Sequence, residues 1–306
     1  MKQVEERYIS LLTDFGFKRI FGTAMNKDLL ICFLNSLFNG RQVVKDVSYL
    51  NPEHVGDVYT DRKAIFDVYC EGENGEKFIV EMQNAYQAYF KDRSLFYSTF
   101  PIREQAPKGN DWNFKLNHVY TVALLNFNMN EDAFDKEKIR HHVQLCDTAT
   151  HKIFYDKLEF IYVEIAKFNK TLEELETLYE KWLYALKNLY KLTQRPKELC
   201  DKVFDRLFEE AEIAKFTPQE IREYEASKMA YRDIKNSIDT AKQEGLAEGI
   251  EIGKAEGIEL GMEKGMAEGK NQKALDIARN MLADGVDINL IMKYSGLTQE
   301  QIEKMK

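Results

Sequence analysis

The arrangement of the expected sheet follows from one segment of the chain, Ile65-Phe-Asp-Val-Tyr-Cys-Glu-Gly-Glu-Asn-Gly-Glu-Lys-Phe-Ile-Val-Glu-Met-Gln83. Two short runs of β-branched, aromatic and polar residues flank Glu73-Asn74-Gly75, a pattern that predicts a β-hairpin. A two-residue loop at Asn74-Gly75 would put carboxylate and amide side chains on the core face. A three-residue loop, with Gly75 left-handed in a bulge, separates a fully apolar face from a mixed one. We expect the second register, because a one-residue slip moves every side chain to the other face.

In the expected register, the two faces of the hairpin differ in polarity. The apolar face consists of Phe66, Val68, Cys70, Phe78, Val80 and Met82. The other face consists of Ile65, Asp67, Tyr69, Glu71, Lys77, Ile79, Glu81 and Gln83. One face therefore suits a protein core, and the other brings carboxylates and a carboxamide together.

Asp67 and Glu81 lie directly opposite each other in this register. Opposed β-carbons are about 4.5–5.5 Å apart, and two carboxylates at roughly 5 Å repel by about 3 kcal/mol at an effective dielectric constant near 20. Such a pair needs either a proton on one carboxylate or a cation between the two. Hard oxygen ligands on adjacent strands suit Mg²⁺. The alternative is a solvated strand face with incidental acidic residues.

The composition fits one large or two ordinary globular domains, because the chain has 306 residues and is 44% hydrophobic. The formal net charge is −8, and most of the acidic excess lies in residues 171–306, which carry 27 acidic and 21 basic side chains. This charge permits DNA binding but does not indicate it. The four scattered cysteines form neither a zinc motif nor a disulfide framework. With a polar N-terminal segment and no apolar run of membrane length, we expect a cytoplasmic protein without a membrane partner.

The first 170 residues alternate between helical and strand patterns. The expected elements, in order, are two helical pieces within residues 8–38, a strand at 43–50, the hairpin, a helix at 88–104, and strands at 118–127, 141–148 and 158–167. This order predicts an α/β (α+β) fold in which helices cover a mixed sheet.

After residue 170 the pattern is almost entirely helical. Thr171 and Glu174 form a capping-box pattern at the start of one helix, and Thr217-Pro218 begins another with proline at its first position. We therefore expect an all-helical C-terminal extension. The expected domains are a sheet domain at 1–170, a helical region at 171–240, a glycine-repeat segment at 241–270 and a small helical tail at 271–306.

Glycine recurs at every fourth residue in the third of these segments, at positions 245, 249, 253, 257, 261, 265 and 269. Each glycine inside a helix costs about 0.8–1 kcal/mol relative to alanine, so an isolated helix of this composition is weak. The repeat has two interpretations. The glycines let a second helix approach closely, as small residues do in membranes, or the segment is a flexible, partly helical tether. We favour self-association, and so expect a homo-oligomer formed through the C-terminal helices.

The tail at 271–306 predicts three short helices. Gly285 closes the first, Asp287 caps the second, and Gly296 with Thr298 separates the third. The spacing resembles that of a helix-turn-helix. Few basic residues fall where a recognition helix would need them, so we favour a small helical or dimerising tail.

Several blocks of the sequence together resemble a known nuclease family. Asp67 followed by Glu81-Met-Gln83 is similar to the Asp…Glu-x-Lys signature of the PD-(D/E)XK nucleases. Asp14-Phe-Gly-Phe-Lys-Arg-Ile-Phe-Gly22, the segment Leu158–Phe168 and the glycine repeat narrow the resemblance to the Rpn recombination-promoting nucleases, also described as PD-(D/E)XK family transposases. The resemblance covers most of the chain. It implies a restriction-endonuclease-like αβββαβ core and a DNA endonuclease that uses Mg²⁺ or Mn²⁺.

The resemblance also implies roles for individual residues. Asp67 and Glu81 would be the metal ligands and, together with Gln83, the catalytic residues. Gln83 stands where the superfamily has lysine; a glutamine cannot accept a proton near neutral pH, so it can only orient water or donate a hydrogen bond. Asp14 is a possible accessory ligand, with an N-cap or turn role favoured. Arg93 would contact a DNA phosphate, with a surface ion pair as the alternative.

The sequence therefore leads to one functional hypothesis and two rivals. The leading hypothesis is a metal-dependent DNA endonuclease that hydrolyses phosphodiester bonds in DNA recombination, with DNA as its partner. The first rival is a catalytically degenerate nuclease fold that acts as a DNA-binding or toxin–antitoxin-like interaction module. The second is a scaffold whose function lies in the glycine repeat and tail. Placement of Asp67 and Glu81 on opposite faces of the hairpin would exclude the leading hypothesis.

Overall fold

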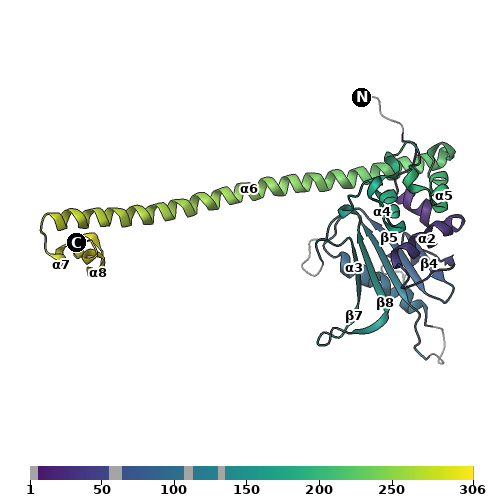
Figure 1. The fold of residues 1–306 in the computed structure, drawn as a ribbon, viewed down its shortest axis with the longest axis horizontal. Coiled ribbons are helices and arrows are strands. Elements are labelled where there is room, and N and C mark those ends of the chain that lie inside the picture. The colour runs from purple at the N-terminus through teal and green to yellow at the C-terminus, as the bar shows by residue number, and fades with distance from the viewer. Residues whose placement is uncertain (1–5, 55–63, 107–112, 130–134, 306) are drawn as a thin grey trace. The chain divides into compact units, whose positions relative to one another are not determined.

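The computed structural model describes residues 6–54, 64–106, 113–129 and 135–305. Contacts within the chain divide it into two units, Met1–Ile238 and Asp239–Lys306. The first unit contains a sheet and the helices that cover it, as Figure 1 shows. No described helix is both long enough and apolar enough to cross a membrane.

A mixed six-stranded sheet forms the centre of the first unit. Its strand order is β1 (Val47–Tyr49), β4 (Val68–Gly72), β5 (Lys77–Gln83), β6 (Val119–Leu125), β8 (Ile153–Glu164) and β7 (Arg140–Cys146). Strands β5, β6 and β8 run parallel, whereas β1, β4 and β7 pair antiparallel with their neighbours. A separate two-stranded ladder joins β2 (Glu53–His54) to β3 (Ala64–Ile65). This architecture confirms the predicted α/β fold with a mixed sheet.

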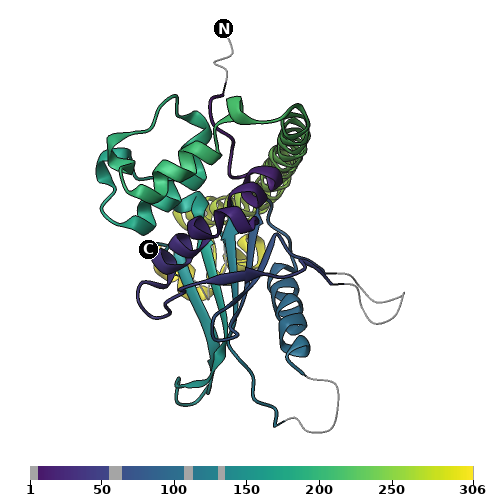
Figure 2. The same ribbon diagram turned by 90° about the vertical axis from the view of Figure 1, so that its right-hand side faces the viewer.

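Helices cover both faces of the sheet. One face packs against α1 (Asp14–Phe21), α2 (Lys27–Phe38), α4 (Leu178–Asn188) and α5 (Lys202–Glu210). In Figure 2 the purple helices α1 and α2 lie beside the green helices α4 and α5, in agreement with the contacts of α2 with α4 and α5. The other face packs against α3 (Phe90–Glu104), which makes the crossover from β5 to the parallel strand β6. Helices α4 and α5 therefore share one core with the sheet.

The hairpin has the register that the sequence predicts. Val68 pairs with Val80 and Cys70 pairs with Phe78. The Gly72 N–H donates a hydrogen bond to the Glu76 carbonyl, which leaves a three-residue loop between them. Gly75 in this loop has a φ of +82°, the left-handed conformation that the turn requires. Turn chemistry and the apolar pattern thus agree on one register.

Phe66 is the exception, because it does not share a face with Val68. The strand is interrupted between β3 and β4, and the chain bends at Asp67. Phe66 therefore packs with Tyr69 and Ile79 under α3, where its ring centroid is 5.3 Å from that of Tyr97. The prediction for Phe66 is wrong for this reason. It follows that the mixed face is covered by α3 and is not a solvated strand face.

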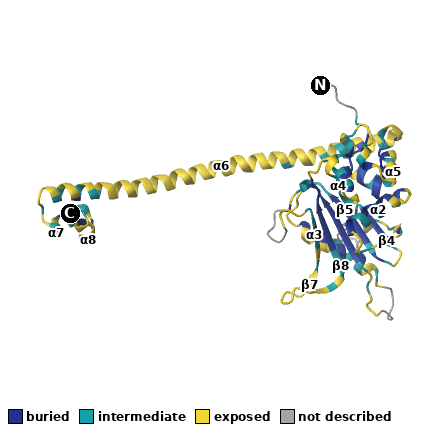
Figure 3. Ribbon diagram, viewed as in Figure 1, coloured by how far each residue is buried: buried dark blue, intermediate teal, exposed yellow. Residues whose placement is uncertain are grey.

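The C-terminal helices begin and end close to the predicted signals. The capping box at Thr171 is present but caps only a 3₁₀ turn; α4 begins seven residues later, with its own capping box at Thr177. Helix α6 (Pro218–Ala283) starts at the predicted proline and continues through the whole glycine repeat. No atom lies within 4 Å of a Cβ added at any repeat glycine, and the repeat is exposed throughout (Figure 3). Self-association through the repeat, like the domain boundaries at 170 and 270, stays a prediction.

The end of the chain forms a small helical unit with its own core. After α6 come α7 (Ile288–Ser295), capped by Asp287, and α8 (Gln299–Glu303), capped by Thr298. Both Gly285 and Gly296 have positive φ angles. The buried core residues are Ala278, Ile291, Leu297 and Ile302. The second and third predicted short helices are therefore confirmed, whereas the predicted first one is the end of the continuous helix α6.

We expect Gly75→Ala to destabilise the fold more than Gly40→Ala. Both glycines have a φ of +82°, so both variants meet the cost of a left-handed alanine, about 1–2 kcal/mol. A Cβ at Gly75 would also lie 2.4 Å from Nδ2 of Asn117, whereas nothing lies within 4 Å at Gly40. Urea denaturation should show the larger loss of unfolding free energy for Gly75→Ala. Equal losses would mean that the hairpin turn tolerates displacement of Asn117.

Candidate active site

Asp67 and Glu81 face each other across the hairpin and hold each other by backbone hydrogen bonds. Asp67 lies at the bend before β4, and Glu81 lies on β5. The Asp67 N–H donates to Oε1 of Glu81 at 3.4 Å. The Met82 N–H donates to Oδ2 of Asp67 at 2.8 Å. In a regular ladder the Met82 N–H would donate to the Phe66 carbonyl, because hydrogen-bonded pairs alternate from Gly72 onward. The bend at Asp67 replaces that carbonyl with a carboxylate.

Both carboxylates are largely removed from solvent. The Glu81 side chain is 7% exposed and the Asp67 side chain is 21% exposed. Burial, and then the charge of Asp67, raises the pKa of Glu81 to about 8. Burial also raises the pKa of Asp67, against the Met82 hydrogen bond, which lowers it. Perturbed acids of this kind are typical of functional sites, because a structural core would avoid them.

A cation approaches each carboxylate from a different helix. Nζ of Lys18 on α1 lies 3.8 Å from Oδ1 of Asp67. On α3, Nη2 of Arg93 lies 3.9 Å from Oε2 of Glu81. Gln83 donates from Nε2 to the same Oε2 at 3.1 Å. The structure thus brings Asp67, Glu81 and Gln83 together and adds two positive charges to them.

The accessory residues named from the sequence have different positions. Thr13, not Asp14, is the N-cap of α1, because its side chain accepts a hydrogen bond from the Gly16 N–H. Asp14 is the first helical residue and pairs with Lys18 at 2.7 Å. Arg93 forms an ion pair, as the alternative interpretation held, but its partner is the candidate ligand Glu81. Its Nη1 also donates to Gln87 at 2.7 Å.

Lys18 is the site residue that sequence reasoning missed. It lies one helical turn after Asp14, inside the block Asp14-Phe-Gly-Phe-Lys-Arg-Ile-Phe-Gly22 that already carried the family resemblance. Nothing in this spacing indicates that α1 docks beside the hairpin, since the two are separated by about 50 residues of chain. The sequence signal for Lys18 is therefore its place in this motif, where a basic residue could supply positive charge to the site.

The donor set fits a divalent cation with few protein ligands. Among the described residues, no group of three or more His, Cys, Asp and Glu side chains could hold a metal ion. Mg²⁺, however, usually binds through one or two carboxylates and fills its other positions with water and substrate phosphates. Two facing carboxylates with raised pKa values take up either a proton or a cation, and a bound cation would let both of them ionise. The residues present therefore suit Mg²⁺ or Mn²⁺.

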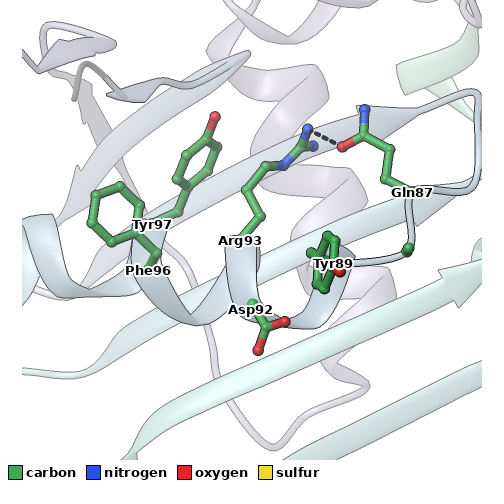
Figure 4. A pocket seen from close by; sticks show the side chains of 7 residues that line it. Gln87, Tyr89, Asp92, Arg93, Phe96 and Tyr97 are labelled. Carbon is green, nitrogen blue, oxygen red and sulfur yellow. Dashed lines mark hydrogen bonds between the residues drawn. The ribbon is translucent and has the colours of Figure 1, made fainter.

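A pocket on α3 is linked to this pair through Arg93. Its volume is about 470 Å³, and Arg93 forms part of its wall. Figure 4 shows Arg93 between Tyr89 on one side and Phe96 and Tyr97 on the other. The same arginine thus contacts Glu81 and the pocket. The site is a buried acidic pair with an open, partly aromatic space next to it.

Two family descriptions match the chain. Residues 11–241 match the PD-(D/E)XK nuclease family transposases. Residues 271–306 match the C-terminal HTH domain of the Rpn/YhgA-like nuclease family. No curated protein and no solved structure matches the chain. The second match supports the helix-turn-helix interpretation of residues 271–306. From the sequence alone, a small helical or dimerising tail is favoured.

The first match spans more than half of the chain and includes the sheet, the helices on both of its faces and both facing carboxylates. PD-(D/E)XK nucleases generally use divalent metal ions, which agrees with the chemistry of the carboxylate pair. The chain therefore belongs to the PD-(D/E)XK nuclease family transposases, and its end corresponds to an Rpn/YhgA-like C-terminal helix-turn-helix domain.

Proposed function

We propose that this protein is a DNA endonuclease that depends on a divalent metal ion, with Asp67 and Glu81 as the metal ligands. One observation carries the proposal: each carboxylate accepts a hydrogen bond from a backbone N–H of the opposite strand, Glu81 from Asp67 and Asp67 from Met82. The fold thus holds two acidic groups together, and without a bound cation the buried Glu81 keeps its proton up to about pH 8. Binding of a cation is the function that makes this arrangement favourable.

The metal and the chain supply different parts of the chemistry. Bound at Asp67 and Glu81, Mg²⁺ or Mn²⁺ would neutralise the scissile phosphate and make an attacking water more acidic. Gln83 holds Oε2 of Glu81 through its amide, so it fixes the orientation of that carboxylate. Arg93 approaches the same oxygen of Glu81 and can contact a phosphate with its planar guanidinium.

Lys18 supplies the ammonium that the motif lacks at position 83. Its Nζ is held between Asp14 at 2.7 Å and Asp67 at 3.8 Å. A fixed positive charge beside a metal ligand stabilises the negative charge that grows on phosphate oxygens during hydrolysis. We therefore assign this role to Lys18 on α1, and only an orienting role to Gln83.

DNA as the partner is supported by the family description of the tail as an HTH domain. Helix-turn-helix domains place one helix in the major groove and hold the backbone with nearby residues. The proposed division of labour is that the tail contributes DNA binding and the sheet unit contributes cleavage.

The first test is cleavage of supercoiled plasmid by the purified full chain. We expect nicking with Mg²⁺, none with EDTA, and none for Asp67→Ala or Glu81→Ala. Asp135→Ala is the matched control, because it removes an exposed carboxylate on the loop before β7. It should cleave like the unmodified protein. Equal cleavage by Asp67→Ala would place the active site elsewhere and refute the assignment.

The role of Lys18 is tested by moving the lysine. Lys18→Gln should lower the cleavage rate by about 10²-fold, the loss typical of one electrostatic group. Adding Gln83→Lys to this variant should restore part of the rate, because position 83 lies within hydrogen-bond distance of Glu81. The control is Lys27→Gln, which removes a lysine of α2 that pairs with Asp46. If Lys18→Gln cleaves at the full rate, Lys18 is only the ion-pair partner of Asp14.

The raised pKa of Glu81 predicts a pH-dependent stability in EDTA. The folded protein keeps the Glu81 proton up to about pH 8, whereas the ordinary pKa of the group is 4.5. Since the folded state binds more protons in this window, stability should fall as pH rises from about 4.5 to 8. Glu81→Gln removes this contribution to the slope.

Melting temperatures at pH 6 and pH 8 give the measurement. In EDTA we expect Glu81→Gln to exceed the unmodified protein at pH 8, and by less at pH 6. Mg²⁺ should raise the melting temperature of the unmodified protein only, because a ligand stabilises the state that binds it. An equal Mg²⁺ effect on both proteins would show that Glu81 does not hold the metal.

A further inference from the structure

The pocket beside Glu81 has a composition that the metal chemistry does not use. Its lining residues are Gln87, Ala88, Tyr89, Asp92, Arg93, Phe96 and Tyr97. Its volume, about 470 Å³, lies within the range of pockets that hold small ligands, roughly 300–1,000 Å³. Three of its lining side chains are aromatic. Gln87 supplies an amide, Asp92 a carboxylate and Arg93 a guanidinium.

Two of these rings are unusually open to solvent. Tyr89 is 78% exposed and Phe96 is 42% exposed. Tyr89 is the N-cap of α3 and Phe96 lies about two turns into the helix, and Figure 4 shows Arg93 between them. Tyr97 also lines the pocket, but its ring packs on Phe66. Phe96 packs edge-on against Phe100, with ring centroids 5.2 Å apart, and the ring of Tyr89 is the more exposed of the two.

We propose that this pocket binds an unpaired base of the DNA substrate, stacked on Tyr89 and Phe96 while Arg93 contacts the adjoining phosphate. The inference rests on the proposed function, since the base would belong to the strand whose phosphate lies at Asp67 and Glu81. It adds a substrate class: DNA with single-stranded, frayed or flipped nucleotides next to the cleavage point.

The polar groups of the pocket favour a base over other occupants. Every base has an apolar face that stacks on aromatic side chains, and exposed rings beside a cationic group form such platforms. Gln87 and Asp92 offer a carboxamide and a carboxylate, which suit the donor and acceptor edge of a base. A site for phosphate alone would not carry a carboxylate. Arg93 also joins the pocket to the catalytic pair, because its Nη2 lies 3.9 Å from Glu81.

The test compares binding of three DNAs to the full chain in EDTA, by fluorescence anisotropy. The probes are a single strand of about 15 nucleotides, an abasic strand of the same length and the corresponding duplex. The abasic strand keeps the phosphates and removes the bases. We expect the unmodified protein to bind the single strand more tightly than the abasic strand. Tyr89→Ala with Phe96→Ala should weaken single-strand binding roughly 5- to 150-fold, the range measured per stacked base.

Phe154→Ala is the matched control. Phe154 is 80% exposed at the start of β8. It lies eight residues before Tyr162, which shares the row of Ala123 and Glu81 across the sheet. This exposed aromatic ring should therefore contribute nothing to base binding. Tyr89→Trp supplies a second measurement, because a base stacked on the new indole should quench its fluorescence and an abasic strand should not.

The outcomes separate this inference from the proposed function. If the double variant binds the single strand and the abasic strand as the unmodified protein does, the base pocket is refuted, even where plasmid cleavage by Asp67 and Glu81 stands. If the double variant loses base-dependent binding while no DNA is cleaved under any condition, the pocket stands and the nuclease assignment fails. If it instead changes the sedimentation coefficient of the free protein, a second copy covers the pocket and the inference is overturned.

Discussion

The register of the β4–β5 hairpin is the constraint on which the rest of the site depends. Gly75 adopts the left-handed conformation that closes a three-residue loop, and this fixes Val68 opposite Val80. The residues of β4 and β5 then have their faces assigned by the two-residue period of a strand. A slip by one residue would move Glu81 to the far face, which packs against the apolar core under α1, α2, α4 and α5. A single backbone conformation thus decides whether two carboxylates can meet.

The bend at Asp67 explains both the site and the failed prediction for Phe66. A regular strand would keep Phe66 on the Val68 face and pair its carbonyl with the Met82 N–H. The break instead sends Phe66 under α3 and gives the Met82 N–H to the Asp67 carboxylate. Strict alternation cannot predict such a break, because the aromatic side chains that stabilise it lie on a helix more than 20 residues away in the chain. Sites commonly depart from regular geometry where chemistry requires a special side-chain orientation.

Sequence reasoning brought together the residues whose placement is local and, apart from Arg93, missed those that tertiary packing brings to them. Asp67, Glu81 and Gln83 follow from turn chemistry and alternation within 19 residues of chain. Lys18 and the pocket rings Tyr89 and Phe96 reach the site only because α1 and α3 dock on opposite faces of the sheet. No spacing rule connects these helices to the hairpin. The glycine repeat shows the converse, since propensity alone predicts a weak helix where the structure has a continuous one.

Helix α3 links the parts of the proposed active site. Near its start, Arg93 approaches Glu81, and the rings of Tyr89 and Phe96 stay open to solvent. On its inner side, Tyr97 and Phe100 pack on Phe66 and so hold the bend that presents Asp67. The same helix therefore sets the orientation of one carboxylate, the charge beside the other and the space in which a base would stack. Because all of these contacts come from one helix, a shift of α3 would alter the proposed metal binding and the proposed substrate selection together.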